Sequence, residues 1–347
     1  MNPLFIEFRD PLFGIIVFFA LVFVIAFFSY WWGRYKTKED HRHLDNFMQQ
    51  FHTLPQKDEL IDLVETGNIS DKSWHLLASS YFQNGEFEKT IEIYQTLVKH
   101  QKDALERRDT LFLLGRTYFK AGFLERARDI FLQILKTNPR TPQALHYLLL
   151  VYEHLRQYDK AFEVLEPLDE LGEDASLDRY YLQAIALIHN NEVSQEEKTA
   201  ALIAIHDTTH QLSYLIFEYL FKHDPDQAWE HLDQSQCQRL SDILWQLPAE
   251  DYNFDIIATN GFLRELFSAK GSVNLAKESD VFELDVLIKL NQHGANGATL
   301  SFEYLCRECK HVLPFSFHRC PNCYAIDSLI CEPNLTKDMF EKNLSFQ

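Results

Sequence analysis

A helical repeat in the first half of the chain constrains the fold more than any other feature. Tyr118 and Tyr152 are 34 residues apart, and Ala127 and Ala161 have the same spacing. An earlier copy places Tyr81 37 residues before Tyr118, which implies about three extra residues between the first two copies. Because a repeat of this length buries its apolar face only against its neighbours, we expect a stacked array of helix pairs.

The repeated pattern resembles the tetratricopeptide repeat, whose small residues let the two helices of a hairpin approach closely. Its large residues fill the space between hairpins. Gly85 and Gly122 stand at the turn between helices, where a positive φ is often needed. Leu149 stands where the first two copies have the small residues Ala78 and Gly115. We therefore expect the two helices of the third hairpin to be farther apart. The other matches are Trp74, Leu77, Ala78, Tyr81, Thr90 and Tyr94, then Leu111, Leu114, Gly115, Tyr118, Ala127, Phe131 and Pro139, then Leu145, Leu148, Tyr152, Ala161 and Leu165.

Beyond Leu171 the pattern decays, although apolar residues continue at helical spacing. Degenerate repeats of this kind are expected near the end of an array. Residues 280–290 fit two patterns, because alternate apolar residues indicate a strand, whereas Leu284, Leu287 and Ile288 share one helical face. This segment is therefore either a strand of the C-terminal unit or a last helix.

Four cysteines near the C-terminus form the strongest chemical motif. Cys306-Arg-Glu-Cys309 and Cys320-Pro-Asn-Cys323 are two Cys-x-x-Cys turns separated by ten residues. Two such turns can supply four thiolates to one tetrahedral zinc or iron ion. Four protein ligands leave no open coordination position, so the site should be structural. Two disulfides, or unrelated buried thiols, are the alternative interpretation.

Residues 12–32 are uncharged and mostly apolar, which predicts a transmembrane helix. At about 1.5 Å per residue, this stretch crosses a hydrocarbon core of about 30 Å. A signal peptide would have a basic N-terminus and a cleavage site with two small residues separated by one other residue. The chain shows neither feature, which favours an uncleaved anchor. One Arg precedes the helix, and four basic residues follow it closely: Arg34, Lys36, Lys38 and Arg42. The positive-inside rule then places the bulk of the chain in the reducing cytoplasm, where thiols favour metal over disulfides.

The charge balance argues against some partners. The chain has 33 Lys and Arg residues against 51 Asp and Glu residues, a net charge of −18 that repels nucleic acid and anionic lipid surfaces. The C-terminal 48 residues carry no excess of basic side chains, so we expect no nucleic-acid partner. The chain has no Gly-rich phosphate loop, His-Glu-x-x-His or Gly-x-Ser-x-Gly motif, and we do not expect an enzyme.

An N-terminal anchor, a repeat array and a C-terminal tetracysteine unit, in this order, resemble the lipopolysaccharide assembly protein B family. The resemblance covers essentially the whole chain, and the C-terminal module of that family is rubredoxin-like. Its most specific residues are Cys306 to Cys309 and the run Phe317-His-Arg-Cys320-Pro-Asn-Cys323. In that family, the first Cys-x-x-Cys turn, here called a knuckle, is followed by Gly, where this chain has Lys310. Because a positive φ costs more for Lys than for Gly, we expect a slightly different knuckle.

The resemblance implies an adaptor of the bacterial inner membrane that regulates lipopolysaccharide synthesis. Members of the family help a membrane AAA+ protease degrade the deacetylase that commits the lipid A pathway. They also associate with lipopolysaccharide transport components and with a membrane-embedded regulator. We expect one zinc (or iron) ion per chain, and the sequence is also compatible with a homo-oligomer. The repeat groove is the expected contact surface.

The sequence thus predicts a mainly α protein with six segments. These are a periplasmic N-terminus (1–11), a transmembrane helix (12–32), a juxtamembrane segment (33–70), a tetratricopeptide-repeat α-solenoid (71–290, clear over 71–170 and degenerate after), a small β zinc-ribbon or rubredoxin-like domain (298–331) and a C-terminal tail (332–347). Two other functional classes stay open. One is a general repeat scaffold for another membrane complex, and the other is an iron-binding redox protein.

Overall fold

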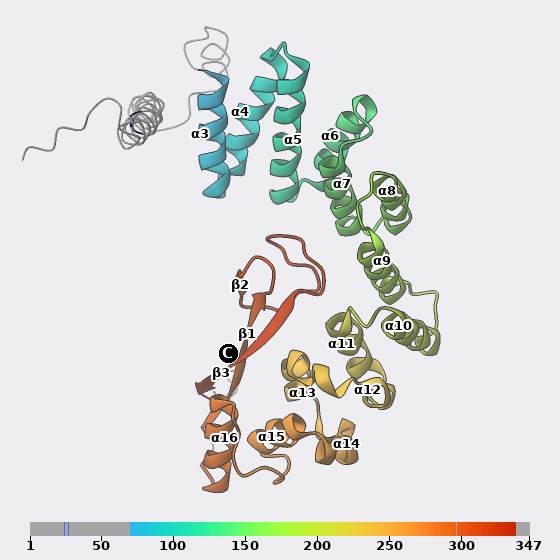
Figure 1. Cartoon of the computed structure of the whole chain (residues 1–347), viewed down its shortest axis with the longest axis vertical. Coiled ribbons are helices and arrows are strands. Elements are labelled where there is room, and N and C mark those ends of the chain that lie inside the picture. The colour runs from blue at the N-terminus through green and yellow to red at the C-terminus, as the bar shows by residue number, and fades with distance from the viewer. Residues whose placement is uncertain (1–23, 25–26, 28–69, 296, 338–347) are drawn as a thin grey trace, which may run out of the picture. The chain divides into compact units, whose positions relative to one another are not determined.

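The computed structural model describes residues 24, 27, 70–295 and 297–337 (Figure 1). The predicted transmembrane helix lies outside these residues apart from Val24 and Phe27, so it stays a prediction. Among the described residues, no helix is both long enough and apolar enough to cross a membrane. The predicted N-terminus and most of the juxtamembrane segment and C-terminal tail also lie outside the described part.

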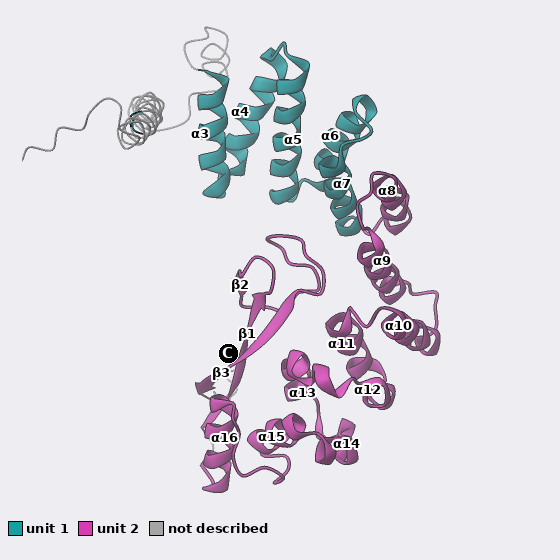
Figure 2. Ribbon diagram, in the orientation of Figure 1, with its two compact units in different colours: residues 1–155 teal, residues 156–347 magenta. Residues whose placement is uncertain are grey.

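The chain divides into two compact units, residues 1–155 and 156–347 (Figure 2). In unit 1, each helix pairs with the next along the chain, and α5 also contacts α7. The prediction of helical hairpins is therefore confirmed for the first two copies. The helices of unit 1 are α3 (Asp71–Gln83), α4 (Phe87–His100), α5 (Ala104–Lys120), α6 (Leu124–Thr137) and α7 (Pro142–His154).

The sequence sets where these helices begin and turn. The Ser70 and Asp103 side chains accept hydrogen bonds from backbone N–H groups in the first turns of α3 and α5. Gly85 and Gly122 have φ values of 77° and 80°, as predicted for the turns. Arg156 holds the same place in the third copy with a φ of 55°. The third turn therefore keeps its geometry at a conformational cost that glycine avoids.

Close packing explains why the repeat needs a small residue at Gly115. A Cβ atom there would lie 2.8 Å from the Phe131 ring, so any side chain would push α5 and α6 apart. Phe131 itself is fully buried between these helices. Leu149, which stands at the corresponding position of the third copy, is also buried.

Unit 2 continues with helices, which become shorter from residue 213 onward, confirming that the degenerate region is helical. The segment at 280–290, which fitted two patterns, is a helix that buries Leu284, Leu287 and Ile288. The helices are α8 (Tyr158–Glu170), α9 (Ser176–His189), α10 (Gln195–Thr209), α11 (Ser213–His223), α12 (Pro225–His231), η1 (Gln234–Leu240), α13 (Ser241–Gln246), η2 (Ala249–Asp251), α14 (Phe254–Thr259), α15 (Gly261–Ala269) and α16 (Phe282–Gln292).

The C-terminal part of unit 2 is a small antiparallel sheet in the order β2-β1-β3. Its strands are β1 (Ala298–Cys306), β2 (Val312–Leu313) and β3 (Leu329–Lys337). β3 runs beyond the expected end at 331, because Ala298 pairs with Lys337 at the far end of the ladder. We call residues 298–337 the ribbon. A mainly helical protein with a small C-terminal sheet is thus confirmed.

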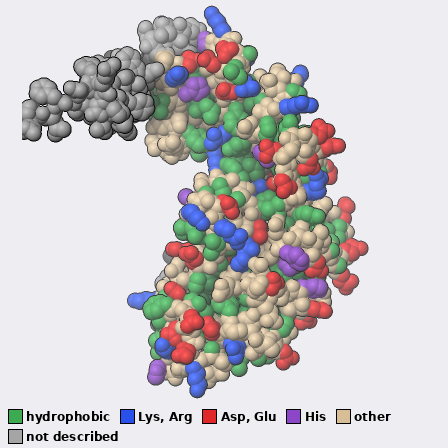
Figure 3. Space-filling model, viewed as in Figure 1, with side chains coloured by type: hydrophobic (Ala, Val, Ile, Leu, Met, Phe, Trp, Pro, Cys, Tyr) green, Lys and Arg blue, Asp and Glu red, His purple; other side chains and the backbone are tan. Residues whose placement is uncertain are grey.

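Acidic side chains dominate part of the surface. Figure 3 shows them gathered along the edge that α8 and α10 form in unit 2. This distribution agrees with the net charge of −18. Such an edge repels anionic polymers and favours cationic or neutral partners.

Candidate metal centre

The two Cys-x-x-Cys turns have the same backbone hydrogen-bond pattern. In the first, the Lys310 N–H donates to the Cys306 carbonyl, at a nitrogen–oxygen distance of 3.0 Å. In the second, the Tyr324 N–H donates to the Cys320 carbonyl over 2.8 Å. The residue after each second cysteine has a positive φ, 59° at Lys310 and 65° at Tyr324. Lys310 therefore adopts the conformation expected of glycine, and both knuckles bring their cysteines to one place.

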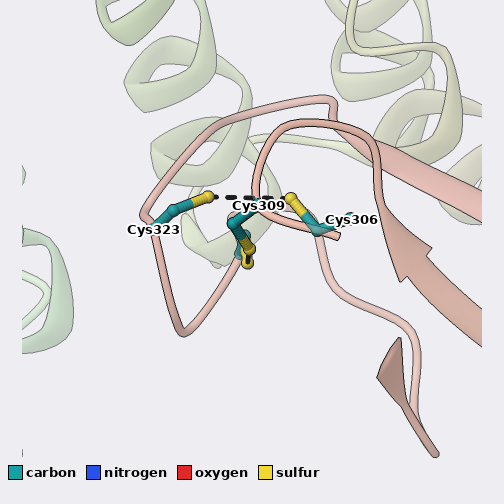
Figure 4. A group of neighbouring side chains, drawn as sticks. Cys306, Cys309 and Cys323 are labelled. Carbon is teal, nitrogen blue, oxygen red and sulfur yellow. Dashed lines mark hydrogen bonds between the residues drawn. The ribbon is translucent and has the colours of Figure 1, made fainter. Parts of the chain in front are cut away.

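The four sulfurs lie within 4.8 Å of one another. The Sγ atoms of Cys306 and Cys323 are 3.6 Å apart, and those of Cys309 and Cys320 are 3.7 Å apart. A tetrahedral zinc with Zn–S bonds of about 2.3 Å requires sulfur separations of about 3.8 Å. Figure 4 shows the sulfurs of Cys306 and Cys323 facing each other beside Cys309. The donor set fits a tetrahedral thiolate site.

The disulfide alternative does not match this arrangement. All six cysteines of the chain are free thiols, and the sulfur separations are far longer than the roughly 2.05 Å of a disulfide bond. Cys237 and Cys331 lie apart from the cluster and are buried. Burial raises the pKa of Cys237 to about 12 and also raises that of Cys331, so both remain protonated. They are ordinary core thiols.

Hydrogen-bond donors face the sulfurs of the first knuckle. Burial opposes ionisation of Cys306, but the Cys309 and Glu308 N–H groups and the Ser328 hydroxyl lower its pKa to about 6. Burial instead raises the pKa of Cys320 and brings that of Cys323 to about 12. A cation at the centre of the cluster favours the thiolate form of every ligand. The site can thus hold one metal ion that joins the two knuckles covalently through sulfur.

The second knuckle is anchored to helices of unit 2 by polar side chains. The Arg319 guanidinium donates to the Asp178 carboxylate of α9 over 2.9 Å, and Arg319 is nearly buried. It also lies over the Tyr181 ring at 4.8 Å from the centroid. The neighbouring His318 binds Glu218 of α11 at a nitrogen–oxygen distance of 2.6 Å. These contacts attach the ribbon to α9 and α11.

An ion pair between Arg239 and Asp327 holds the chain just before β3. The Arg239 guanidinium, from η1, donates to the Asp327 carboxylate over 2.9 Å and to its backbone carbonyl over 3.0 Å. Both side chains are mostly buried, so their attraction is screened less by water and salt than that of an exposed pair. Asp327 has a positive φ of 51°, so the pair holds the backbone in the left-handed region that most non-glycine residues avoid.

A buried polar network completes the attachment. The hydroxyls of Tyr214 in α11 and Tyr304 in β1 both donate to the Asp242 carboxylate of α13, over 2.5 and 2.8 Å. Burial raises the pKa of both tyrosines, and the Asp242 charge raises it further, so both hydroxyls remain donors. Sequence reasoning missed this network. The sequence signal that could have found it is Asp242, an acidic residue beside the apolar Ile243 and Leu244.

Comparison with known proteins places the repeats in a family. The tetratricopeptide repeat family matches residues 71–102 and 109–141. Lipopolysaccharide assembly protein B of Escherichia coli K12 is 29% identical over 171 residues, which are 45% of this chain and 43% of that protein. The chain is a tetratricopeptide-repeat relative of lipopolysaccharide assembly protein B. This confirms the predicted resemblance, although the chain spans less than half the length of the curated relative it matches.

Other proteins are also similar to this chain. Photosystem I assembly protein Ycf3 of Synechococcus elongatus is 26% identical over 161 residues, 44% of this chain and 87% of that protein. A solved tetratricopeptide repeat protein from Parabacteroides merdae is 15% identical and covers 74% of this chain and 98% of its own, with a TM-score of 0.37.

Proposed function

We propose that the protein is a membrane-anchored adaptor that regulates lipopolysaccharide synthesis. The similarity over 171 residues to lipopolysaccharide assembly protein B carries this proposal. The tetrathiolate ribbon adds support, because the predicted family has a metal module at the same end of the chain. Repeat arrays act by presenting extended surfaces to other proteins, which agrees with an adaptor rather than an enzyme.

The adaptor would bring a client protein to a membrane protease. In this proposal the client is the deacetylase that commits the lipid A pathway, and the protease is a membrane AAA+ enzyme. Lipopolysaccharide transport components and a membrane-embedded regulator would be further partners. Anchoring both proteins at one membrane turns a bimolecular encounter into a nearly intramolecular one, with effective concentrations of order mM for short linkers.

The anchor in this proposal is the predicted helix at 12–32 in the bacterial inner membrane. Residues 1–11 would be periplasmic, and both compact units would be cytoplasmic. The predicted span lies N-terminal to the repeats in the chain. It can therefore tether the array to the membrane without being inserted between two of its helices. The basic residues that follow the span support this orientation.

One zinc ion per chain would have a structural role. Cys306, Cys309, Cys320 and Cys323 would hold it, and the ion would supply cross-linking between the knuckles. The knuckles in turn position Arg319 and His318 against Asp178 and Glu218. The metal therefore stabilises the surface that the ribbon and its helices present together.

Crosslinking in membranes tests the proposed partners. Cells that express the full chain would be treated with a short amine-reactive crosslinker, and the purified complexes analysed by mass spectrometry. We expect the protease and the deacetylase among the crosslinked proteins, and fewer of both when residues 1–33 are deleted. Recovery of components of an unrelated membrane complex, without either protein, would contradict the proposal and favour the general scaffold.

A further inference from the structure

A cavity of about 350 Å³ lies where α11, α13 and the ribbon meet in unit 2 (Figure 1). This volume falls within the range of about 300–1,000 Å³ that is common for small-molecule sites. Polar groups from all three parts converge on it: Tyr214 and Glu218 from α11, Asp242 from α13 and Tyr304 from β1. The cavity therefore has both the size and the polar wall of a ligand site.

Asp242 is the buried acid of this cavity and is 3% exposed. Its two strong hydrogen bonds, from the Tyr214 and Tyr304 hydroxyls, end on one carboxylate oxygen, Oδ2. Among the described residues, the other oxygen, Oδ1, is buried without a hydrogen-bond partner. Burial raises the pKa of the nearby Cys331 thiol and the Asp242 charge raises it further, but a thiol is only a weak donor. Because buried polar atoms are normally hydrogen-bonded, Oδ1 points to a donor that is not among these residues.

The described residues supply no cation to this carboxylate. Arg239, His318 and Arg319, which come from η1 and the ribbon, each bind a different carboxylate. Lys222 of α11 also lines the cavity, but it is exposed and is not a partner of Asp242. A buried charge is costly unless it is paired as well as hydrogen-bonded. A ligand that carries positive charge would complete the site.

The tyrosine hydroxyls act as acceptors toward any ligand of this cavity. Each hydroxyl has one hydrogen, and both Tyr214 and Tyr304 direct it at Asp242, so their oxygens can only accept a further hydrogen bond. Glu218 adds a carboxylate, which is also an acceptor and is held by His318 over 2.6 Å. A primary ammonium has three N–H donors on one compact cation and matches such a set. A guanidinium needs two parallel acceptors, and one oxygen of Asp242 is already occupied.

We propose that this cavity binds a small aliphatic amine in its ammonium form. The ammonium would donate to the Asp242 carboxylate and to the tyrosine oxygens. Its alkyl chain would lie against Phe221 and Leu247, which line the same cavity. The ligand would contact α11, α13 and the ribbon at once, so its binding favours the state in which the ribbon is attached. A ligand of this kind is independent of the proposed client and protease.

Calorimetric titration of the full-length protein in phosphatidylcholine nanodiscs tests this assignment. The probe is butylamine at pH 7.5, where it is an ammonium ion. The alcohol 1-butanol has the same chain without the charge, and tetramethylammonium has the charge without N–H donors. Constant ionic strength keeps the general attraction of cations to a chain of net charge −18 the same in every titration. The fourth probe, Nα-acetyl-lysine amide, stands for a lysine side chain of another protein.

We expect butylamine to bind at least tenfold more tightly than 1-butanol or tetramethylammonium, because hydrogen bonds between charged partners are stronger than neutral ones. Asp242→Asn should abolish this preference. Asp226→Asn is the matched control, since it makes the same change in net charge at an exposed residue of α12 outside the cavity lining, and it should keep the preference. Gln246→Trp places a large side chain at an exposed part of the lining while Asp242 stays in place, and should weaken butylamine binding at least fivefold.

Equal binding of butylamine and 1-butanol, including no binding of either, would overturn the assignment. So would an unchanged preference in the Asp242→Asn protein, or tetramethylammonium binding as tight as that of butylamine. Circular dichroism melting would verify that each variant is folded. If Asp242→Asn does not fold, an unchanged butylamine affinity in Gln246→Trp overturns the assignment instead. If Nα-acetyl-lysine amide binds more tightly than butylamine, the ligand is a lysine side chain and the small-amine assignment is wrong.

Discussion

The Tyr304 hydroxyl donates to the Asp242 carboxylate over 2.8 Å, joining the central strand of the ribbon to α13 inside the protein. Asp242 is only 3% exposed, and Tyr214 supplies a second donor to the same oxygen. A buried carboxylate is costly without such donors. The ribbon is therefore a folded part of unit 2 rather than a freely tethered module.

Removing one donor should loosen this attachment. We expect Tyr304→Phe to lower the free energy of unfolding of the full chain by about 1–3 kcal/mol, because a buried charged acceptor loses a partner. Tyr252→Phe is the control, since its hydroxyl bonds an exposed Ser272 and should cost under about 1 kcal/mol. Urea unfolding would measure both. Equal effects of the two substitutions would contradict the role given to Asp242.

The cysteine cluster should contain metal in the purified protein. Elemental analysis of freshly prepared, reduced protein is expected to find one zinc ion per chain and no visible absorption. Cys309→Ser should lower the metal content and destabilise the ribbon while the repeat array stays helical by circular dichroism. A red protein with stoichiometric iron would support the redox alternative. Protein with neither metal would refute the site.

The turn at Arg156 should accept glycine with a gain in stability. Arg156 has a φ of 55° where the first two repeats have Gly85 and Gly122. We expect Arg156→Gly to stabilise the protein by about 1 kcal/mol, since only glycine adopts this conformation at no steric cost. Arg156→Ala keeps the unfavourable Cβ and should give no such gain. A thermal midpoint that falls in the glycine variant would show that the side chain contributes more than the backbone strain costs.

Stability should fall in mild acid, chiefly because of the buried His206. Burial lowers the pKa of His206, which is 6% exposed and lies 3.4 Å from the Ser213 hydroxyl. The unfolded chain, with a histidine pKa of about 6.5, then binds protons before the folded chain does. The folded state is favoured above that pH and loses this stability as the pH falls through the lowered folded pKa. His75 and His223 act in the same direction.

Urea unfolding at pH 7.5, 6 and 5 would measure this effect. We expect a smaller free energy of unfolding at pH 5 than at pH 7.5, and a weaker pH dependence in His206→Gln. His293→Gln is the control, because His293 is exposed at the end of α16. Stability that rises from pH 7.5 to pH 5 would contradict the sign. If the free energy of unfolding of His206→Gln changed with pH as much as that of the wild type, His206 would not be a source of the pH dependence.

The repeats were predictable because their determinants are local. A 34-residue spacing, two turn glycines and the small Gly115 define helices and their packing without knowledge of the rest of the chain. The cysteine cluster was predictable for the same reason, since each knuckle is a short turn. At 280–290 both patterns were present, and burial of one helical face against neighbouring elements decided between them.

The attachment of the ribbon was not predictable from the sequence. Arg319 and Asp178 are 141 residues apart, and His318 and Glu218 are 100 apart. Nothing in the spacing of such residues indicates that they meet, because their contact depends on how the intervening helices stack. The Asp242 network was hidden in the same way, since each of its three residues comes from a different element.

The half-life of the lipid A pathway deacetylase tests the adaptor proposal most directly. It would be measured after protein synthesis is stopped, in cells with the full chain, with a chain lacking residues 1–33, or with Cys309→Ser. Only the full chain should give rapid loss of the deacetylase, because the tether and the ribbon are both needed. If depletion of the full chain leaves the half-life and the lipopolysaccharide level unchanged, the adaptor proposal is wrong.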